Sequence, residues 1–286
     1  MRRREFLTTV AAASLLPQVT GRAAAAPAAA APEQLKLGVA SYSLRKFPFD
    51  KALEMTTACD VKYINFKDVH VPRTDSPEAL KAARAKTEAA GLTIMGGGTI
   101  TWVQKGPTWE ASDAEQVRKD FEYAKLMGMP LIVAAPSFEA LDTVEKTAKE
   151  FDIKVAIHNH GPEDKFFPSP YDVYKHVKDR DKHMGMCVDI GHTWRAKVDP
   201  TKAVLELQDR VYDLHVKDLA DLNKRDSQVI VGKGAIDFPG LFRALVKIGY
   251  QGHVGLEYEI DVDNPLPGML QSFAYMRGVL AGIRQT

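Results

Sequence analysis

The stretch IKVAIHNH, residues 153–160, carries the pattern that decides the fold of this chain. Its apolar, β-branched-rich run is bounded by Asp152 and Gly161, which is typical of a strand buried on both faces. Side chains alternate along a strand, so His158 and His160 point the same way from its C-terminal end. A buried strand with a polar end, repeated between helices, is the sequence pattern of a parallel α/β fold.

Seven other segments show the same strand pattern, each a short apolar run beside Gly, Pro or Asp. They span residues 35–44, 62–68, 92–101, 130–136, 185–191, 211–219 and 252–260. Between the strands, helical spacing of apolar residues is clearest over residues 76–91, 113–128, 137–152, 238–250 and 266–283. Eight strands and eight helices over about 250 residues predict a single-domain α/β fold, the (β/α)8 TIM barrel.

Alternation of strands and helices does not by itself close a sheet, so a doubly wound open sheet is the alternative fold. A nucleotide-binding open sheet would carry G-x-G-x-x-G after its first strand, and no such motif follows residues 35–44. The isolated GGG at residues 96–98 indicates only local room for the backbone. The sequence therefore favours the closed barrel.

The first 32 residues differ in composition from the rest of the chain. The motif RRREFL, residues 2–7, fits the twin-arginine export pattern, and an Ala/Pro tract with A-x-A sites follows. The apolar stretch between them, residues 6–16, is too short to span a bilayer. We predict a cleavable export signal and linker over residues 1–32, a barrel domain over 33–286, and a periplasmic or otherwise exported protein without a stable membrane anchor. A basic disordered tail is the alternative.

The chain has 38 basic and 37 acidic residues, for a formal net charge of +1. This balance gives no basic surface for nucleic acid or anionic lipid, so we expect a small-molecule partner and no nucleic acid. The two cysteines, Cys59 and Cys187, fall in a predicted outer helix and a predicted inner strand. We expect both to be unpaired core residues. An oligomer is possible on this sequence.

Ionisable residues gather at the C-terminal ends of four consecutive predicted strands, the end at which barrel enzymes build their active sites. They are His158, Asp189, His215 and Glu257. Each one alone has an ordinary explanation, such as a hydrogen-bonded core histidine or an aspartate in a turn. Together, buried without partners, they would cost several kcal/mol, and one divalent cation bound to all four removes that cost. Two imidazoles and two carboxylates suit Mn²⁺, Zn²⁺, Fe²⁺ or Co²⁺.

Four motifs around these residues resemble those of a known superfamily. They are VDIGH (188–192), LHVKD (214–218), VGKGAIDF (231–238) and GLEYE (255–259). From Leu35 to Ile283 the chain resembles the sugar phosphate isomerase/epimerase superfamily, the xylose isomerase-like TIM barrels that include endonuclease-IV-type enzymes. Its pattern is most similar to exported keto-sugar-processing or inosose-dehydratase-like members.

The resemblance implies a metal held by a Glu, an Asp, a His and a Glu on strands five to eight. Asp189, His215 and Glu257 match the last three positions, and His158 stands where the epimerases have the first glutamate. Because the two glutamates of those epimerases also move the proton, this departure weakens the case for two-base epimerisation. The repair enzymes carry a D-x-H segment that reads DSQ here, at residues 226–228, so DNA repair is disfavoured.

Such a site suits proton abstraction next to the carbonyl of a sugar or keto-sugar, through an enediolate that the metal stabilises. Reprotonation would make the protein an isomerase or epimerase. Loss of a β substituent from a 3-keto-sugar or keto-glycoside would make it a lyase or dehydratase. A periplasmic sugar-binding protein without turnover, and a hydrolase that uses metal-bound water, are further alternatives.

The remaining ionisable and aromatic residues near the predicted strand ends are candidates for catalysis and substrate binding. The catalytic candidates are His160, Lys67, Glu257 and Lys217. The substrate-binding candidates are His192, His70, Trp194, Arg195 and Glu259, of which Glu259 could also act as a base. We expect His70, Trp194 and Arg195 on loops above the strand ends, where each could equally be an ordinary surface residue. No arginine cluster for phosphate is visible in the sequence, so we expect an unphosphorylated substrate.

Overall fold

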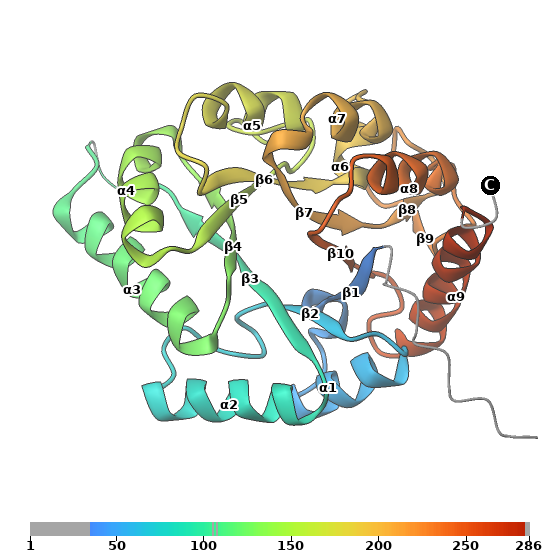
Figure 1. Ribbon diagram of the computed structural model, residues 1–286, viewed down its shortest axis with the longest axis horizontal. Helices are drawn as coiled ribbons and strands as arrows, with labels where there is room; N and C mark the ends of the chain where they lie inside the picture. The colour runs from blue at the N-terminus through green and yellow to red at the C-terminus, as the bar shows by residue number, and fades with distance from the viewer. Residues whose placement is uncertain (1–34, 105, 107, 284–286) are drawn as a thin grey trace, which may run out of the picture. The chain divides into compact units, whose positions relative to one another are not determined.

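The computed structural model describes residues 35–283 apart from residues 105 and 107, and within them eight parallel strands close into a barrel (Figure 1). The barrel strands are β1 (Lys36–Ala40), β2 (Tyr63–Phe66), β3 (Thr93–Trp102), β4 (Leu131–Pro136), β5 (Lys154–His158), β6 (Met184–Asp189), β7 (Val211–Val216) and β10 (His253–Leu256). A separate two-stranded antiparallel sheet consists of β8 (Asp218–Leu219) and β9 (Gln228–Val229). The predicted export signal and linker, residues 1–32, lie outside the described residues.

Closure of the sheet decides between the two folds that the sequence allowed. The strands run in the order β1-β10-β7-β6-β5-β4-β3-β2, and the first and last barrel strands pair in parallel through Lys36–His253 and Val39–Leu256. An open sheet would leave these two strands as edges. The chain is therefore a TIM barrel, as predicted.

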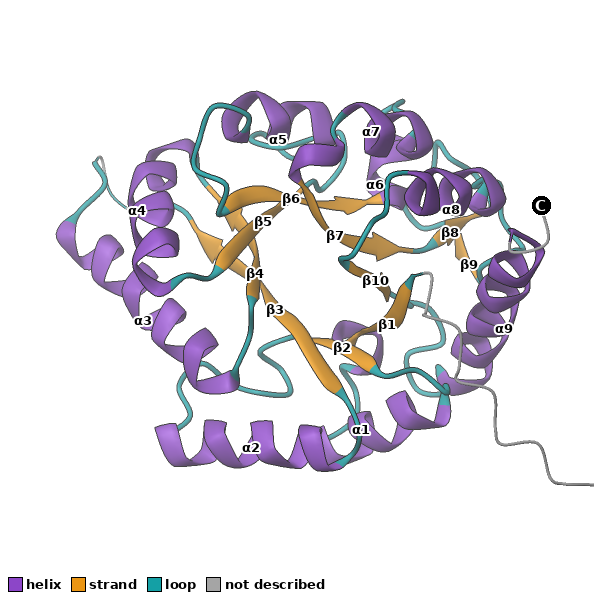
Figure 2. Ribbon diagram, in the orientation of Figure 1, coloured by secondary structure: helices purple, strands orange, loops and turns teal. Residues whose placement is uncertain are grey.

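The helices pack around the outside of the strands (Figure 2). They are α1 (Phe49–Ala58), α2 (Pro77–Ala89), α3 (Ala111–Met127), α4 (Leu141–Phe151), α5 (Pro170–Val177), α6 (Ile190–Arg195), α7 (Pro200–Glu206), α8 (Phe238–Lys247) and α9 (Leu266–Ile283). One more helix is present in the described residues than we predicted, because the connection from β6 to β7 holds both α6 and α7. None of the helices in the described part of the chain has the length and apolar character needed to cross a membrane.

Local signals explain where the predicted helices begin and end. The Ser76 hydroxyl accepts a hydrogen bond from the Ala79 backbone at 3.2 Å, as expected of a residue that caps α2. Helix α3 begins two residues before the predicted Asp113, since the Asp113 carboxylate accepts a hydrogen bond from the Glu110 backbone N–H at 3.0 Å. Gly128 ends this helix at φ 69°, a left-handed conformation that glycine adopts without strain.

Both cysteines are buried core residues, as the sequence predicted. Cys187 packs inside the barrel with Leu131, Val133 and Ala156, and Cys59 ends α1. Both thiols are buried and unpaired. Strand β6, which carries Cys187, is buried along its whole length, in keeping with a parallel sheet covered on both faces.

Several barrel strands are shorter than predicted, because the chain leaves the sheet where its polar residues begin. The segment predicted as strand 35–44 ends at Ala40, and Ser41–Leu44 forms a turn of 3₁₀ helix. Glu257 and Glu259 likewise follow β10 rather than belonging to it. Some of the polar residues that we predicted at the ends of strands are therefore the first residues of the following loops.

The small β8–β9 sheet, which the sequence analysis did not predict, joins two of the motifs. The Asp218 carboxylate accepts hydrogen bonds from the backbone N–H groups of Gly232, Gly234 and Ile236 at 2.9, 3.0 and 3.2 Å. Asp218 ends LHVKD, and the three donors belong to VGKGAIDF. These motifs therefore build one rigid loop beside the C-terminal end of β7.

Candidate metal centre at the C-terminal mouth of the barrel

Four neighbouring strands deliver the predicted ligand residues to one point. His158 ends β5, Asp189 ends β6, His215 lies near the end of β7, and Glu257 follows β10. One ligand atom from each residue lies within 4.8 Å of the other three. His158, Asp189 and His215 are buried, and Glu257 is half-buried. The convergence on one point that the sequence predicted is therefore present.

The separations between the ligand atoms fit a single bound ion. His158 Nε2 lies 3.0 Å from His215 Nδ1 and 3.6 Å from Asp189 Oδ2. His215 Nδ1 lies 3.6 Å from Glu257 Oε2. Two atoms bound at about 2.1 Å to one ion are about 3.0 Å apart in octahedral and about 3.4 Å apart in tetrahedral geometry. The donor set therefore fits a divalent ion with only small movements of the side chains.

The two carboxylate oxygens of Asp189 have different surroundings: Oδ1 caps a helix, and Oδ2 faces the shared centre and the Lys217 ammonium. Its Oδ1 accepts a hydrogen bond from the His192 backbone N–H at 2.8 Å, which caps helix α6. Its buried Oδ2 accepts no hydrogen bond from the described residues. The Asp189 backbone N–H donates to Asn159 Oδ1 at 3.0 Å, which fixes the end of the strand. Capping of α6 thus orients the carboxylate so that Oδ2 points at the shared centre.

Lys217 neutralises the carboxylates in this structure. Its ammonium lies 2.7 Å from Glu257 Oε2, 2.5 Å from Glu259 Oε1 and 3.2 Å from Asp189 Oδ2. Burial alone would lower the pKa of Lys217, but the three carboxylates outweigh burial and hold that pKa well above its usual value. Burial would also raise the pKa of Glu257 and of Asp189. Lys217 lowers the pKa of Glu257 to about 2 and helps to hold that of Asp189 well below its ordinary value.

The two imidazoles of the centre face each other through one nitrogen atom each. Burial, followed by the neighbouring His160, lowers the pKa of His158 to about 3. The 3.0 Å contact between His158 Nε2 and His215 Nδ1 is a hydrogen bond, in which one of the two nitrogens carries the proton. A neutral imidazole is the form of histidine that binds metals. Displacing that one proton would expose two lone pairs to an ion.

A second set of three residues, His158, Cys187 and His215, also satisfies the geometric requirements of a metal site. Burial is the largest cause that holds the pKa of the Cys187 thiol well above its usual value, so this sulfur stays protonated. A thiol binds metals as the thiolate. Ionised Asp189 and Glu257 therefore make the four-residue set the better candidate.

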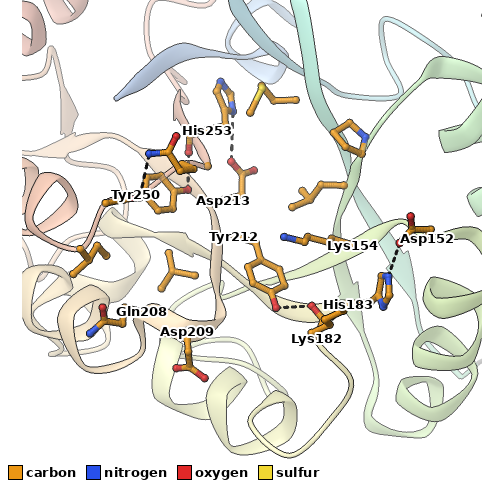
Figure 3. Close-up of a pocket in the computed structure, with 18 residues that line it drawn as sticks. Asp152, Lys154, Lys182, His183, Gln208, Asp209, Tyr212, Asp213, Tyr250 and His253 are labelled. Atoms are coloured by element: carbon orange, nitrogen blue, oxygen red, sulfur yellow. Dashed lines mark hydrogen bonds and ion pairs between the residues drawn. The ribbon is translucent and has the colours of Figure 1, made fainter. Parts of the chain in front are cut away.

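A cavity of about 530 Å³ opens beside this centre. The predicted site residues that line it are Lys67, His158, His160, His192, Arg195, Lys217, Glu257 and Glu259. A larger cavity of about 1080 Å³ lies at the opposite mouth, where residues such as Lys154 and His253 begin their strands (Figure 3). We assign the functional site to the smaller cavity, because the ligand residues meet there and barrel active sites form at the C-terminal strand ends.

His160 lies two residues after the candidate ligand His158, and both line the same cavity. The centroids of the two imidazole rings are 4.3 Å apart. His160 Nδ1 lies 3.2 Å from Asp164 Oδ2, and the backbone N–H groups of Phe166 and Phe167 donate to Asp164 Oδ1 at 2.7 and 3.0 Å. The cavity therefore contains a histidine that lies beside a fixed carboxylate, although its Nδ1 makes no hydrogen bond within the described residues, and that is separate from the four candidate ligands.

Two predicted substrate-binding residues do not reach the cavity. His70 is buried, and its ring nitrogens lie 3.0 Å from the Ser41 hydroxyl and 3.1 Å from the Leu44 carbonyl oxygen, so it is a hydrogen-bonded core residue. Trp194 lies on α6 rather than on a loop and packs partly buried against the hydrophobic core. His70 lies in the turn after β2, as expected, whereas Trp194 does not lie on a loop, and neither residue lines the cavity where we expected them to bind substrate.

Arg195 and His192 lie on α6 and do line the cavity, although Arg195 was expected on a loop. Arg195 is buried, pairs with Glu163, and places its Nη1 3.1 Å from His192 Nδ1. Burial is the largest influence on His192 and lowers its pKa. Helical spacing of three puts these two side chains on the same face of α6 and leaves Trp194 on another.

Other lining residues were missed by the sequence analysis. They are Tyr42, Arg45, Thr99, Thr101, Arg225 and Gln228. Tyr42 and Arg45 could have been found, because Tyr42 lies near the end of the first predicted strand and Arg45 directly follows it. Arg225 and Gln228 come from the unpredicted β8–β9 segment, which no strand or helix pattern marked. Arg45, Arg195 and Arg225 line the cavity together with Asp226, Glu257 and Glu259, and the unphosphorylated substrate that we expected stays a prediction.

Gln228 connects the β8–β9 sheet to the residues that follow β10. Its side-chain amide donates to the Glu257 carbonyl oxygen at 2.6 Å and accepts from the Glu259 backbone N–H at 2.9 Å. The two contacts hold both glutamates in place beside Lys217. The DSQ segment, noted only for its missing histidine, therefore supplies a residue that shapes the site.

The fold and site define the class: a TIM barrel with a candidate metal centre at its C-terminal mouth. The chain belongs to the Xylose isomerase-like TIM barrel family, whose pattern it matches over residues 52–279. Among curated proteins it is similar to the rhizopine catabolism protein MocC of Rhizobium meliloti, with 26% identity over 141 residues. That similarity covers 44% of this chain and 42% of the relative, so the match spans less than half of the relative's length.

Three solved structures illustrate the fold similarity. They are an IOLI protein with a bound zinc atom (TM-score 0.71, 16% identity, 87% of this chain and 99% of that one), an L-ribulose 3-epimerase (0.70, 15%, 88% and 96%) and the probable 3-DHS dehydratase AsbF of Bacillus anthracis (0.70, 11%, 85% and 99%). At these identities the similarity shows a shared fold. The family and these neighbours agree with the predicted superfamily of sugar isomerases, epimerases and dehydratases.

Proposed function

We propose that this protein is a divalent-metal-dependent enzyme that removes a proton next to the carbonyl group of a sugar or keto-sugar. The observation that carries the proposal is the convergence of two imidazoles and two carboxylates beside a cavity that holds further ionisable side chains. The names of two fold neighbours, an epimerase and a dehydratase, support carbohydrate chemistry of this kind.

His158, Asp189, His215 and Glu257 would hold the ion. Bound there, a divalent cation would supply the positive charge that stabilises the enediolate as the substrate loses its proton. The donor set suits Mn²⁺, Zn²⁺, Fe²⁺ or Co²⁺. Lys217, which now pairs with two of these ligands, would keep its contact with Glu259, to which it already lies at 2.5 Å.

His160 is the first candidate for the base. It lines the cavity without belonging to the ligand set, and Asp164 lies 3.2 Å from its Nδ1. The Asp164 carboxylate would stabilise the imidazolium that forms when His160 takes up a proton. Lys217 would donate a hydrogen bond to the substrate oxygen that gains charge. Lys67 and Glu259 line the same cavity and are the alternative proton carriers.

His158 favours elimination as the second candidate function. Epimerisation by two bases needs a proton-carrying group on each face of the substrate, and the resemblance implied two glutamates for that work. A histidine at the strand-five position leaves Glu257 as the only glutamate among the ligands. One base that removes the α proton, followed by loss of a β substituent, fits a 3-keto-sugar or keto-glycoside substrate.

Solvent exchange tests the proposal. The metal-loaded protein is incubated in D₂O with ketoses and 3-keto-glycosides, and deuterium at the α carbon is followed by NMR. We expect incorporation that a chelator abolishes, that His160→Gln lowers at least about 100-fold, and that the control His176→Gln, on helix α5, leaves unchanged. Release of the β substituent together with exchange would identify a lyase.

Binding of the sugar without any exchange would contradict an enzyme. That outcome would instead support the sugar-binding protein considered from the sequence. Turnover that proceeds without deuterium incorporation, and that continues after chelation, would contradict both the metal and the enediolate. Each outcome is read on the same sample.

We also propose export by the twin-arginine route, based on RRREFL at residues 2–7. The full-length chain is expected in the exported fraction with its first residues removed. Replacing Arg3 and Arg4 by lysine should retain the protein in the cytoplasm at full length. Equal export of the wild type and this double variant would contradict the proposal.

A further inference from the structure

Beneath the candidate metal centre, the barrel interior holds a second buried polar group. Asp213 lies two residues before His215 on β7, so both side chains point into the barrel. Its carboxylate is 1% exposed. Oδ2 accepts a hydrogen bond from the Asn65 amide at 3.1 Å, whereas Oδ1 has no hydrogen-bond partner among the described residues. A buried, ionisable group with an unused oxygen calls for a functional explanation.

His215 has a buried ring nitrogen that lacks a hydrogen-bond partner among the described residues. Its Nδ1 faces the centre, 3.0 Å from His158 Nε2 and 3.6 Å from Glu257 Oε2. Its Nε2 is buried without a hydrogen-bond partner in the described part of the chain, and Asp213 Oδ2 is 3.9 Å away. When Nδ1 gives its lone pair to a metal, the imidazole proton must sit on Nε2. The Asp213 carboxylate is the acceptor beside that proton.

We propose that Asp213 is the positioning residue of the metal centre, which fixes His215 as the Nε2–H tautomer and aims its Nδ1 at the ion. A carboxylate that accepts the outer N–H of a ligating histidine orients the ring and increases the basicity of the ligand nitrogen. The inference rests on the metal centre of the proposed function. We expect the present 3.9 Å separation between His215 Nε2 and Asp213 Oδ2 to shorten to a hydrogen bond once His215 gives up its contact with His158.

His253 supports Asp213 from the other side. Its Nδ1 lies 3.5 Å from Asp213 Oδ1, the contact marked by a dashed line in Figure 3. The ring is 2% exposed and fits closely against the backbone of its neighbours: a Cβ at Gly38 would lie 2.5 Å from His253 Nε2, and one at Gly255 2.6 Å from its Cε1. The two glycines therefore leave the space that the imidazole fills.

The cavity at the N-terminal mouth reaches this pair. Asp213 and His253 both line it, together with the exposed Lys154 and the half-buried Tyr212 (Figure 3). Asp213 therefore lies between this cavity and the candidate metal centre.

Replacing the carboxylate by an amide separates a positioning role from a purely structural one. In Asp213→Asn, the amide N–H₂ can turn toward His215 Nε2, which favours the proton on Nδ1 and blocks the ligand lone pair. The matched control is Asp120→Asn. Asp120 is also 1% exposed and carries hydrogen bonds from Trp102 and Arg73, but it lies on α3, away from the centre.

The test measures Zn²⁺ and Co²⁺ dissociation constants by competition with a chromophoric chelator, and the visible absorption spectrum of the Co²⁺ form. We expect Asp213→Asn to weaken both ions about 10- to 100-fold and to change the Co²⁺ spectrum, with Asp120→Asn equal to the wild type in both. Wild-type affinity and an unchanged spectrum in Asp213→Asn would overturn the inference, as would equal losses in the two variants.

A measurement on the wild type covers the case in which Asp213→Asn does not fold. Nitrogen-15 NMR of histidine-labelled, Zn²⁺-loaded protein is expected to show His215 protonated at Nε2 in a strong hydrogen bond. Protonation at Nδ1, or an Nε2–H without a partner, would overturn the role of Asp213. A wild type that binds neither ion would instead contradict the proposed function itself, so the two failures are distinguishable.

Discussion

Lys217 is the residue on which the charge balance of the centre depends. Its ammonium contacts Asp189, Glu257 and Glu259 at 3.2 Å or less, at 5% exposure. Because a metal ion would compete with it for two of these carboxylates, the lysine and the ion are alternative sources of positive charge. This exchange makes Lys217 a residue whose removal should affect the metal-free and metal-bound proteins differently.

Lys217→Met is expected to lower the free energy of unfolding of the metal-free protein by about 3 kcal/mol, since three carboxylates lose their buried partner. Added Zn²⁺ should then raise the melting temperature by more than it does in the wild type, although turnover falls. Differential scanning fluorimetry with and without Zn²⁺ measures both effects. The control is Lys149→Met, at an exposed position on α4. An equal Zn²⁺ shift in the wild type and Lys217→Met would contradict this charge exchange.

His158 distinguishes this centre from the one that the resemblance implied, which has a glutamate at the same position. A neutral imidazole favours Zn²⁺ and Co²⁺, whereas a carboxylate favours Mn²⁺ and Mg²⁺. We expect His158→Glu to keep a metal site but to shift its preference toward Mn²⁺ by about tenfold or more, measured by competition titration. His158→Leu, which offers no donor, should bind all of these ions weakly. An unchanged preference in His158→Glu would show that His158 is not a ligand.

At the scale of secondary-structure elements, His183 connects the turn before β6 to the end of α4. It lies at the N-terminal mouth of the barrel. His183 Nδ1 lies 2.7 Å from Asp181 and its Nε2 lies 2.9 Å from Asp152, which ends α4. The Asp152 hydrogen bond is the largest cause, and it raises the pKa of His183 above its ordinary 6.5. A raised pKa means that the stabilisation is complete below pH 6.5 and is lost as pH rises through the folded-state pKa.

The wild type should therefore lose part of its free energy of unfolding as the pH rises above 6.5, and His183→Gln should lose less over the same range. Both ion pairs are solvent-accessible, so the difference is expected to be well below 1 kcal/mol. Urea unfolding of the metal-free proteins at several pH values measures it. A steeper loss of stability in His183→Gln than in the wild type would contradict this sign.

The β8–β9 segment is the element that completes the wall of the site. A Cβ at Gly234 would overlap the Asp218 carboxylate and lie 2.6 Å from the Leu219 carbonyl oxygen. Gly234→Ala should therefore lower the free energy of unfolding by about 2 kcal/mol and raise KM, since the loop that positions Gln228 is displaced. Gly278→Ala on α9, where a Cβ meets open space, is the control and should not be destabilised. Equal stability of both variants would contradict the close packing.

The elements also show which parts of the site the sequence could predict. Period-two alternation placed His158 and His215 in the barrel interior because side-chain direction in a strand follows directly from residue spacing. The same logic failed for His70 and Trp194, since loop and short-helix residues have no such fixed direction. Asp189 was correctly placed, but its second function as the cap of α6 depends on a helix that the sequence analysis did not predict.

At the scale of the whole molecule, the barrel was predictable because its signal is repeated along the chain. Eight buried runs that alternate with helices fix a parallel sheet, and the total length favours closure. The lining from Arg225 and Gln228 was not predictable, since it depends on a two-residue strand pair packed by long-range contacts. The relation of Asp213 to His215 and His253 was likewise not predictable, since it depends on distances within β7 and between β7 and β10.

We propose that four neighbouring strands together bind one divalent ion, and anomalous X-ray diffraction at the zinc edge locates such an ion. Crystals of the Zn²⁺-loaded protein should show one strong peak per chain, about 2.0–2.2 Å from His158 Nε2, Asp189 Oδ2, His215 Nδ1 and Glu257 Oε2. The peak should be absent in His215→Ala crystals prepared in the same way. A wild-type map with no peak among these four atoms, or with the zinc bound elsewhere, would contradict the account.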